Sequence, residues 1–127
     1  MTKNPPVVKN FMAAPNDKEI MESVIKAACQ YYEISEDELM NQSKKADPVA
    51  IRRMSMYLIM KNTSLRDYVV AERFGITRTP LNDSVGIIEV HAKIYRQTSG
   101  TLQAIANIAN NFEKKYAWHI QSTNTIS

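Results

Sequence analysis

Cysteine, histidine and glycine are all scarce in this chain of 127 residues, and each scarcity excludes a class of protein. The single cysteine, Cys29, cannot form an internal disulfide, which favours a reducing compartment such as the cytoplasm. The two histidines, His91 and His119, do not combine with it in any spacing typical of a zinc site. Three glycines and five prolines are too few for the many turns of a β-sandwich.

Long apolar runs and nucleotide-binding loops are also missing. No stretch is apolar enough for a signal peptide or for crossing a membrane, so we expect a protein without a membrane partner. No Gly-rich loop ends in Lys and Ser or Thr, which argues against nucleotide binding and hydrolysis. Glu89 and His91 are two residues apart and diverge on an expected helix. We therefore expect no enzyme, no catalytic residue, no metal and no cofactor.

Apolar residues make up 44% of the chain, and they recur at helical spacing along most of it. Cap signals mark where the helices begin: Ser35 precedes Glu38 by three residues, and Asp47 stands directly before Pro48. Asn16 with Glu19 and Ser64 with Asp67 give the same kind of signal. Helices are expected over residues 16–31, 35–42, 48–61, 64–75, 78–98 and 101–117, with Thr98-Ser99-Gly100 breaking the last two apart.

The length suits one hydrophobic core, so the sequence predicts a single all-α domain of about six helices. The domain is expected over residues 16–120. A flexible arm of residues 1–15, with three prolines, is expected to precede it, and a disordered tail of residues 121–127 to follow.

The stretch "AERFGITRTPLNDSV" has the pattern of a helix-turn-helix. Ala71 is small enough for a second helix to pack across it, Gly75 supplies the positive φ of the turn, and Ile76 fills the core behind it. Leu81 and Val85 then anchor the second helix. The pattern favours DNA binding over an ordinary helical hairpin, because the polar residues left outside include arginine and asparagine.

The polar residues that face outward on the second helix are the candidates for recognising a DNA sequence. The side chains of arginine and asparagine match the edges of guanine and adenine with two hydrogen bonds each. Thr77 or Thr79 would cap the second helix and touch a phosphate. The expected base contacts are Arg78, Thr79, Asn82 and Asp83, and Thr77 is an expected phosphate contact.

A second cationic group lies before and within the third expected helix. Lys44 and Lys45 precede its start, and Arg52 and Arg53 lie in its first turn and a half. Cations are unfavourable at a helix N-terminus, whereas free N–H groups there bind anions. A DNA phosphate would satisfy both the side chains and the helix end, so these four residues are expected phosphate contacts.

Residues 20–98 resemble the C-terminal DNA-binding domain of the bacterial chromosomal replication initiator, DnaA. The resemblance lies in "ACQYYEISEDELM", in "NQSKKADPVAIRRMSMYLIMKNTSLRDYVVAERFG" and in "IIEVHAKI". It implies that a basic loop and the next helix start grip phosphates and the minor groove, while a helix-turn-helix enters the major groove. Lys44 and Lys45 fall in that loop, and Arg52 and Arg53 match the helix-start pair. The implied role is that of a replication-initiator-like accessory protein or a transcription regulator.

One segment departs from the initiator family. Its Arg-Asp-His-Thr-Thr signature after Phe-Gly-Gly is absent, and Phe74-Gly75 is followed by "ITRTPLNDSVG". Locally, "FGITRTPLND" looks more like the turn and recognition helix of GntR-type regulators, although no strand pair for a wing follows. DNA binding is therefore expected, whereas binding to the initiator's usual DNA box stays an open question.

The last expected helix, with Leu102, Ile105, Phe112, Tyr116 and Trp118, extends beyond the resembling region. Three roles are open for it: completing the core, forming a homodimer, or docking another protein. The alternative function is therefore a helical protein-interaction module that uses this C-terminal helix and binds no DNA.

Overall fold

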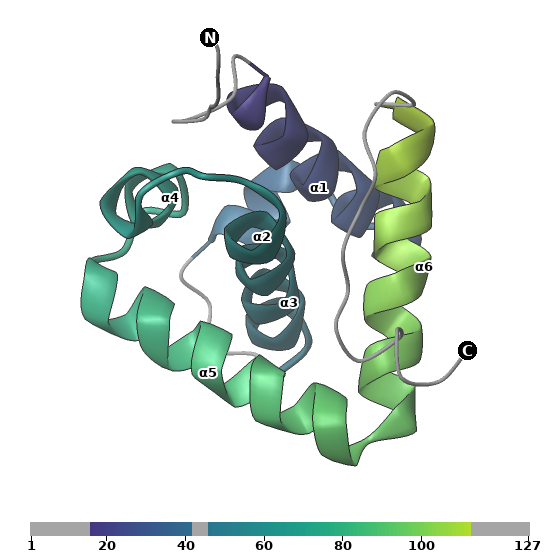
Figure 1. The fold of residues 1–127 in the computed structure, drawn as a ribbon. Coiled ribbons are helices and arrows are strands. Elements are labelled where there is room, and N and C mark those ends of the chain that lie inside the picture. Colours follow the sequence, from purple (N-terminus) through teal and green to yellow (C-terminus); the bar gives the residue numbers. More distant parts are fainter. Residues whose placement is uncertain (1–15, 42–45, 113–127) are drawn as a thin grey trace, which may run out of the picture.

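The computed structural model describes residues 16–41 and 46–112, which fold into six helices with no strand (Figure 1). The all-α prediction is confirmed for these residues. The expected arm and tail, and residues 42–45 and 113–120, lie outside the described part. The helices are α1 (Asp17–Tyr32), α2 (Glu36–Met40), α3 (Ala46–Asn62), α4 (Asp67–Arg73), α5 (Arg78–Ile94) and α6 (Arg96–Phe112).

Helix α3 runs through the middle of the molecule and contacts each of the other five helices (Figure 1). Its apolar residues point in more than one direction, as in a helix that is buried on most sides. Ile51, Tyr57, Leu58 and Ile59 are all at most 2% exposed. The prediction that the third helix is central is therefore confirmed.

Helices α1 and α6 pack against each other and close the fold. The apolar stripe of α1 is buried, and so is that of α6, where Leu102, Ile105 and Ala109 are 0% exposed. The described part of the C-terminal helix thus completes the core of its own chain. Its apolar stripe is not free for the homodimer or the protein partner that the sequence left open, and Tyr116 and Trp118 lie outside the described residues.

Three of the four predicted caps behave differently from expectation, and one of them is Asp47, which lies inside α3 because that helix begins at Ala46. The Ser35 hydroxyl accepts a hydrogen bond from the Glu38 N–H at 3.1 Å, as predicted. Asn16 occupies the N-cap of α1 without a side-chain cap bond. Ser64 is not the cap of α4, which starts at Asp67: its backbone N–H donates instead to the carboxylate of Asp17 at 2.8 Å. That contact holds residue 64 against the start of α1, outside the helix.

The break between α5 and α6 falls at Tyr95, not at Thr98-Ser99-Gly100. Tyr95 has an extended backbone, with φ −108° and ψ 118°, and α6 begins at the next residue. The Ser99 hydroxyl donates to the carbonyl of Arg96 at 3.0 Å, and Ser99 is buried. Small polar residues here begin a helix instead of ending one. None of the helices in the described ranges is long and apolar enough to span a membrane.

Candidate nucleic-acid interface

The turn between α4 and α5 has the geometry of a helix-turn-helix. Gly75 has φ 71°, the left-handed conformation that only glycine adopts without strain, so the predicted positive φ is confirmed. The Gly75 N–H donates to Glu72 and the Ile76 N–H to Ala71, both at 3.0 Å. This pair of bonds is a Schellman motif, which satisfies the last carbonyls of α4. Ala71, at 1% exposure, lies beneath the turn as expected.

The inner side of α5 holds it against the rest of the core. Leu81 is 0% exposed and Ile88 is 5% exposed, and Val85 packs partly buried against them. Thr77 occupies the N-cap position without a side-chain cap bond, and its side chain is exposed. The first turn of α5 therefore projects from the body with its inner side fixed and its polar residues outside.

All four residues expected to contact bases are exposed on this first part of α5: Arg78, Thr79, Asn82 and Asp83. Because Arg78 and Asn82 are four residues apart, their side chains lie on the same side of the helix. The Asn82 amide donates to the carboxylate of Asp67 at 3.0 Å, across the gap between α5 and α4. That bond orients Asn82 and is the main cause of a lowered pKa at Asp67.

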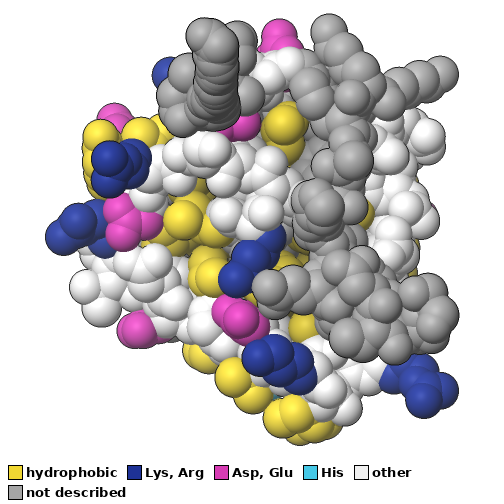
Figure 2. Space-filling model, viewed as in Figure 1, with side chains coloured by type: hydrophobic (Ala, Val, Ile, Leu, Met, Phe, Trp, Pro, Cys, Tyr) yellow, Lys and Arg dark blue, Asp and Glu magenta, His cyan; other side chains and the backbone are white. Residues whose placement is uncertain are grey.

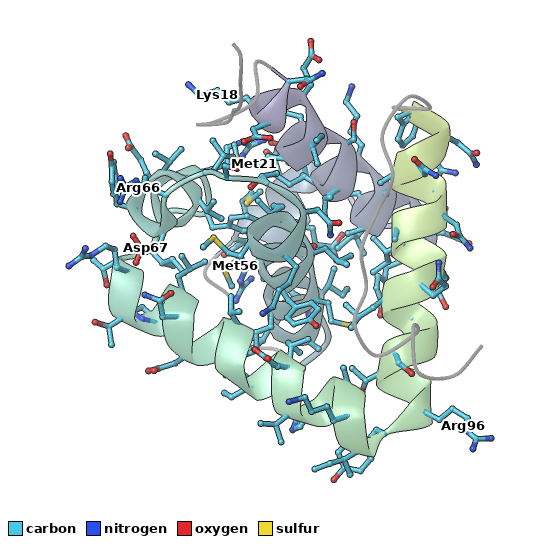
Figure 3. All side chains as sticks on the ribbon, viewed as in Figure 1. Lys18, Met21, Met56, Arg66, Asp67 and Arg96 are labelled. Atoms are coloured by element: carbon cyan, nitrogen blue, oxygen red, sulfur yellow. The ribbon has the colours of Figure 1, made fainter. Side chains whose placement is uncertain are left out.

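Charges of both signs gather where α4 begins. Figure 3 shows Arg66 and Asp67 together at this end of the molecule, beside the first turn of α5. In Figure 2 the same corner carries basic and acidic side chains side by side. The attraction of Arg78 and Arg66 contributes to the lowered pKa of Asp67, after its hydrogen bonds. Arg66 was absent from the contacts expected from sequence, because only the packing of α4 on α5 brings it beside Arg78.

Arg52 is not the exposed cation that the sequence suggested. It is 9% exposed, and its guanidinium donates to the carbonyl oxygens of Leu39 at 3.0 Å and Asn41 at 2.7 Å. Burial, followed by repulsion from Arg53, lowers its pKa. The guanidinium thus binds the C-terminal end of α2, where carbonyls lack helical partners. The expectation that it faces phosphates is corrected accordingly.

Arg73, a cation on α4, is also engaged within the molecule. It forms two hydrogen bonds with the carboxylate of Glu22, at 2.7 and 2.8 Å, and one with Glu36 at 2.7 Å. These bonds join α4 to α1 and α2 and raise the pKa of Arg73. Its charge is therefore compensated inside the fold.

The remaining expected phosphate contacts fall into two groups. Arg53 is half-buried on α3, next to Arg52. Lys44 and Lys45 lie outside the described residues. The structure thus brings the predicted base contacts together at one end of α5, with Thr77 and Arg66 beside them, and turns Arg52 inward.

Comparisons with known proteins add no family to this geometry: the chain matches no family model and no curated protein.

Proposed function

We propose that this chain binds double-stranded DNA, with the first part of α5 as the segment that enters the major groove. The observation that carries the proposal is the exposed pair of Arg78 and Asn82, fixed from behind by the buried Leu81. In helix-turn-helix proteins the N-terminal residues of the second helix reach the base edges. The resemblance of residues 20–98 to the DnaA C-terminal domain supports the same assignment.

The bond between Asn82 and Asp67 is compatible with base reading. An asparagine amide has two N–H groups and a carbonyl oxygen, and the bond to Asp67 uses one N–H. One donor and one acceptor remain, which is the pair that adenine requires in the major groove. Asp67 thus holds the amide in a fixed orientation before DNA arrives.

The neighbouring residues have different parts in the proposal. Thr77 and Thr79 are placed for phosphate or base contact at the start of α5, and Arg66 extends the cationic surface onto α4. Asp83 is exposed but points about a third of a turn away from Arg78 and Asn82, at roughly 100° per residue. The reading pair is therefore Arg78 and Asn82. Arg53, Lys44 and Lys45 stay as proposed phosphate contacts.

The proposed role is that of a replication-initiator-like accessory protein or a transcription regulator in the cytoplasm, without enzyme activity or a nucleotide. The one cysteine supports this view. Burial is the main cause that raises the pKa of the Cys29 thiol, and the nearby carboxylate of Glu36 raises it further. A protonated, partly buried thiol is a poor nucleophile.

The test begins with selection of bound sequences from random duplexes, followed by fluorescence anisotropy on the preferred site. Arg78→Ala and Asn82→Ala should each weaken binding by about 1–3 kcal/mol and relax preference at one or two base positions. Non-specific binding should fall less, and more for Arg78→Ala because a charge is lost. Lys18→Ala is the matched control: it removes an exposed charge on α1, far from α5 (Figure 3).

The control variant should bind almost as the wild type does. Equal losses in Lys18→Ala and Arg78→Ala would show that overall charge, and not α5, controls the interaction. Wild-type affinity in both α5 variants would overturn the assignment of the reading pair. If the wild type binds no duplex even at about 50 mM salt, where phosphate contacts are strong, DNA binding itself is wrong.

A further inference from the structure

The outer side of α5 carries an apolar surface that the DNA proposal does not use. It consists of Gly86, Ile87, Val90 and Ile94, and we call it the α5 outer face. Val90 is 53% exposed and Ile94 is 64% exposed. A shallow groove of about 610 Å³ runs along it, from Asn82 to His91. Figure 2 shows hydrophobic side chains along the lower edge of the molecule, where α5 lies.

A surface helix normally needs one apolar side, which it turns to the core. The inner side of α5 already meets that need through Leu81, Ile88 and Ala92, each at most 6% exposed. The second apolar side is contiguous, because its residues recur every three or four positions. Contiguous exposed apolar surfaces of this kind mark interaction sites.

We propose that a second copy of this chain docks on the α5 outer face, with the two α5 helices antiparallel. A two-fold axis through Val90 would bring Ile94 over Gly86 of the partner subunit. Gly86 is exposed, and no atom lies within 4 Å of where its Cβ would be, so the notch at this position is open. An apolar side chain that fills a notch across a two-fold axis makes the surface complementary to itself.

The charges at the two ends of the face fit this arrangement. Asp83 lies at the N-terminal end, and Arg96 lies just past the C-terminal end, pointing away from the body in Figure 3. Within one chain they are roughly 20 Å apart at 1.5 Å per residue, too far to form an ion pair. In an antiparallel pair, Asp83 lies beside Arg96 of the partner subunit. A parallel pair would instead bring like charges together.

The geometry also fits the DNA proposal, on which this one step rests. At roughly 100° per residue, Asn82 points about a quarter turn and Arg78 about a third of a turn away from Val90 on the α5 outer face. The two-fold axis of an antiparallel pair is perpendicular to the line that joins the two helices. The reading residues of both subunits therefore point mainly along this axis, toward the same side of the dimer. Along the helices, their Arg78 positions are roughly 36 Å apart and their Asn82 positions roughly 24 Å apart. Half-sites one turn of DNA apart are separated by about 34–36 Å.

Sedimentation velocity of the full chain without DNA, from low to high micromolar concentrations, tests the interface. We expect a monomer–dimer equilibrium in the wild type. Val90→Asp and Ile94→Asp should each raise the dimer Kd about tenfold or more, with unchanged helical circular dichroism. Phe112→Asp is the matched control, since Phe112 is a similarly exposed apolar residue on α6. A wild type that stays monomeric, or a loss of dimer in Phe112→Asp alone, would overturn the proposal.

A charge exchange tests the orientation. Asp83→Arg and Arg96→Asp should each weaken the dimer, and the double variant should restore it, because the intermolecular pair is rebuilt with its charges reversed. Failure of the double variant to recover would exclude the antiparallel arrangement. The outcome is independent of DNA binding: a monomer that reads DNA overturns only the interface, and a dimer that binds no DNA overturns only the proposed function.

Discussion

A single guanidinium group, that of Arg52, holds the end of α2 against α3. Its Nη1 donates to two carbonyls, of Leu39 and Asn41, that the short helix cannot satisfy itself. Arg52→Met keeps most of the apolar stem and removes both bonds, so the free energy of unfolding should fall by about 1.5–3 kcal/mol. Urea unfolding followed by circular dichroism measures the loss.

Arg53→Met is the matched control for that substitution, since it removes the same charge from the next residue of α3. Arg53 is less buried, and its loss should change stability by no more than about 0.5 kcal/mol. Equal effects of the two substitutions would contradict the structural role of Arg52.

The ion pair of Glu22 with Arg73 makes stability depend on pH. The hydrogen bonds from Arg73 to the Glu22 carboxylate are the main cause of a pKa of Glu22 below the ordinary 4.5, whereas burial acts in the opposite direction. The contribution of this ion pair to the free energy of unfolding is therefore complete above pH 4.5, and it is lost as the pH falls through the lower pKa of the folded state. Glu22→Gln should cost about 1 kcal/mol at neutral pH, a modest value because the carboxylate is partly exposed.

The measurement is chemical unfolding of wild type and Glu22→Gln at a series of pH values. The difference between their unfolding free energies should shrink as the pH falls below 4.5, where the wild-type carboxylate becomes protonated. A difference that stays constant into acid would show that shape, and not charge, accounts for the loss.

These two arginines also show what the sequence could not reveal. Arg52 finds its carbonyls 11 and 13 residues away, and Arg73 finds Glu22 at a separation of 51 residues. No local pattern indicates such partners, and for this reason Arg52 was expected on the surface as a phosphate contact. The exposed position of Arg78 and Asn82 was predictable, because it follows from helical period alone once Leu81 is placed in the core.

At the scale of elements, the α4–α5 turn depends on one glycine. Alanine at position 75 would have to adopt φ 71°, which costs an L-residue roughly 1–2 kcal/mol. Gly75→Ala should therefore lower the unfolding free energy by that amount, as measured by thermal or urea denaturation.

Gly100→Ala serves as its counterpart. Gly100 lies in α6 with no atom within 4 Å of an added Cβ. Alanine there should raise stability by about 0.5–1 kcal/mol, since glycine is a poor helix former. If both substitutions shift stability in the same direction, the left-handed conformation of Gly75 is not what the turn requires.

Helix boundaries were predictable where a local signal is sufficient and wrong where packing decides. Ser35 caps α2 as its spacing from Glu38 indicates. By contrast, the buried carboxylate of Asp17 draws the backbone of Ser64 away from a cap position. The burial of Ser99 likewise places it inside α6 and moves the break to Tyr95.

For the molecule as a whole, the 16 lysine and arginine residues overstate the number of cationic side chains that DNA could meet. Arg52 and Arg73 are engaged inside the fold, and Lys61 pairs with Glu89 at 3.4 Å. The described residues of a single copy thus offer few phosphate contacts, and affinity from counterion release grows with their number. Two copies joined through α5 would double that number and place two reading pairs on one duplex.

The contact between α1 and α6 has a consequence for how the protein is made. Among the described helices, α1 leaves the ribosome first and α6 last, and α1 packs more extensively on α6 than on α2 or α3. The part of the core that α6 covers therefore stays open until residue 112 has emerged, and the helix-turn-helix at residues 67–94 is synthesised before that part is closed. During translation, part of the apolar stripe of α1 stays exposed until α6 has been made. The nascent chain is therefore the form of the protein that most needs protection from aggregation.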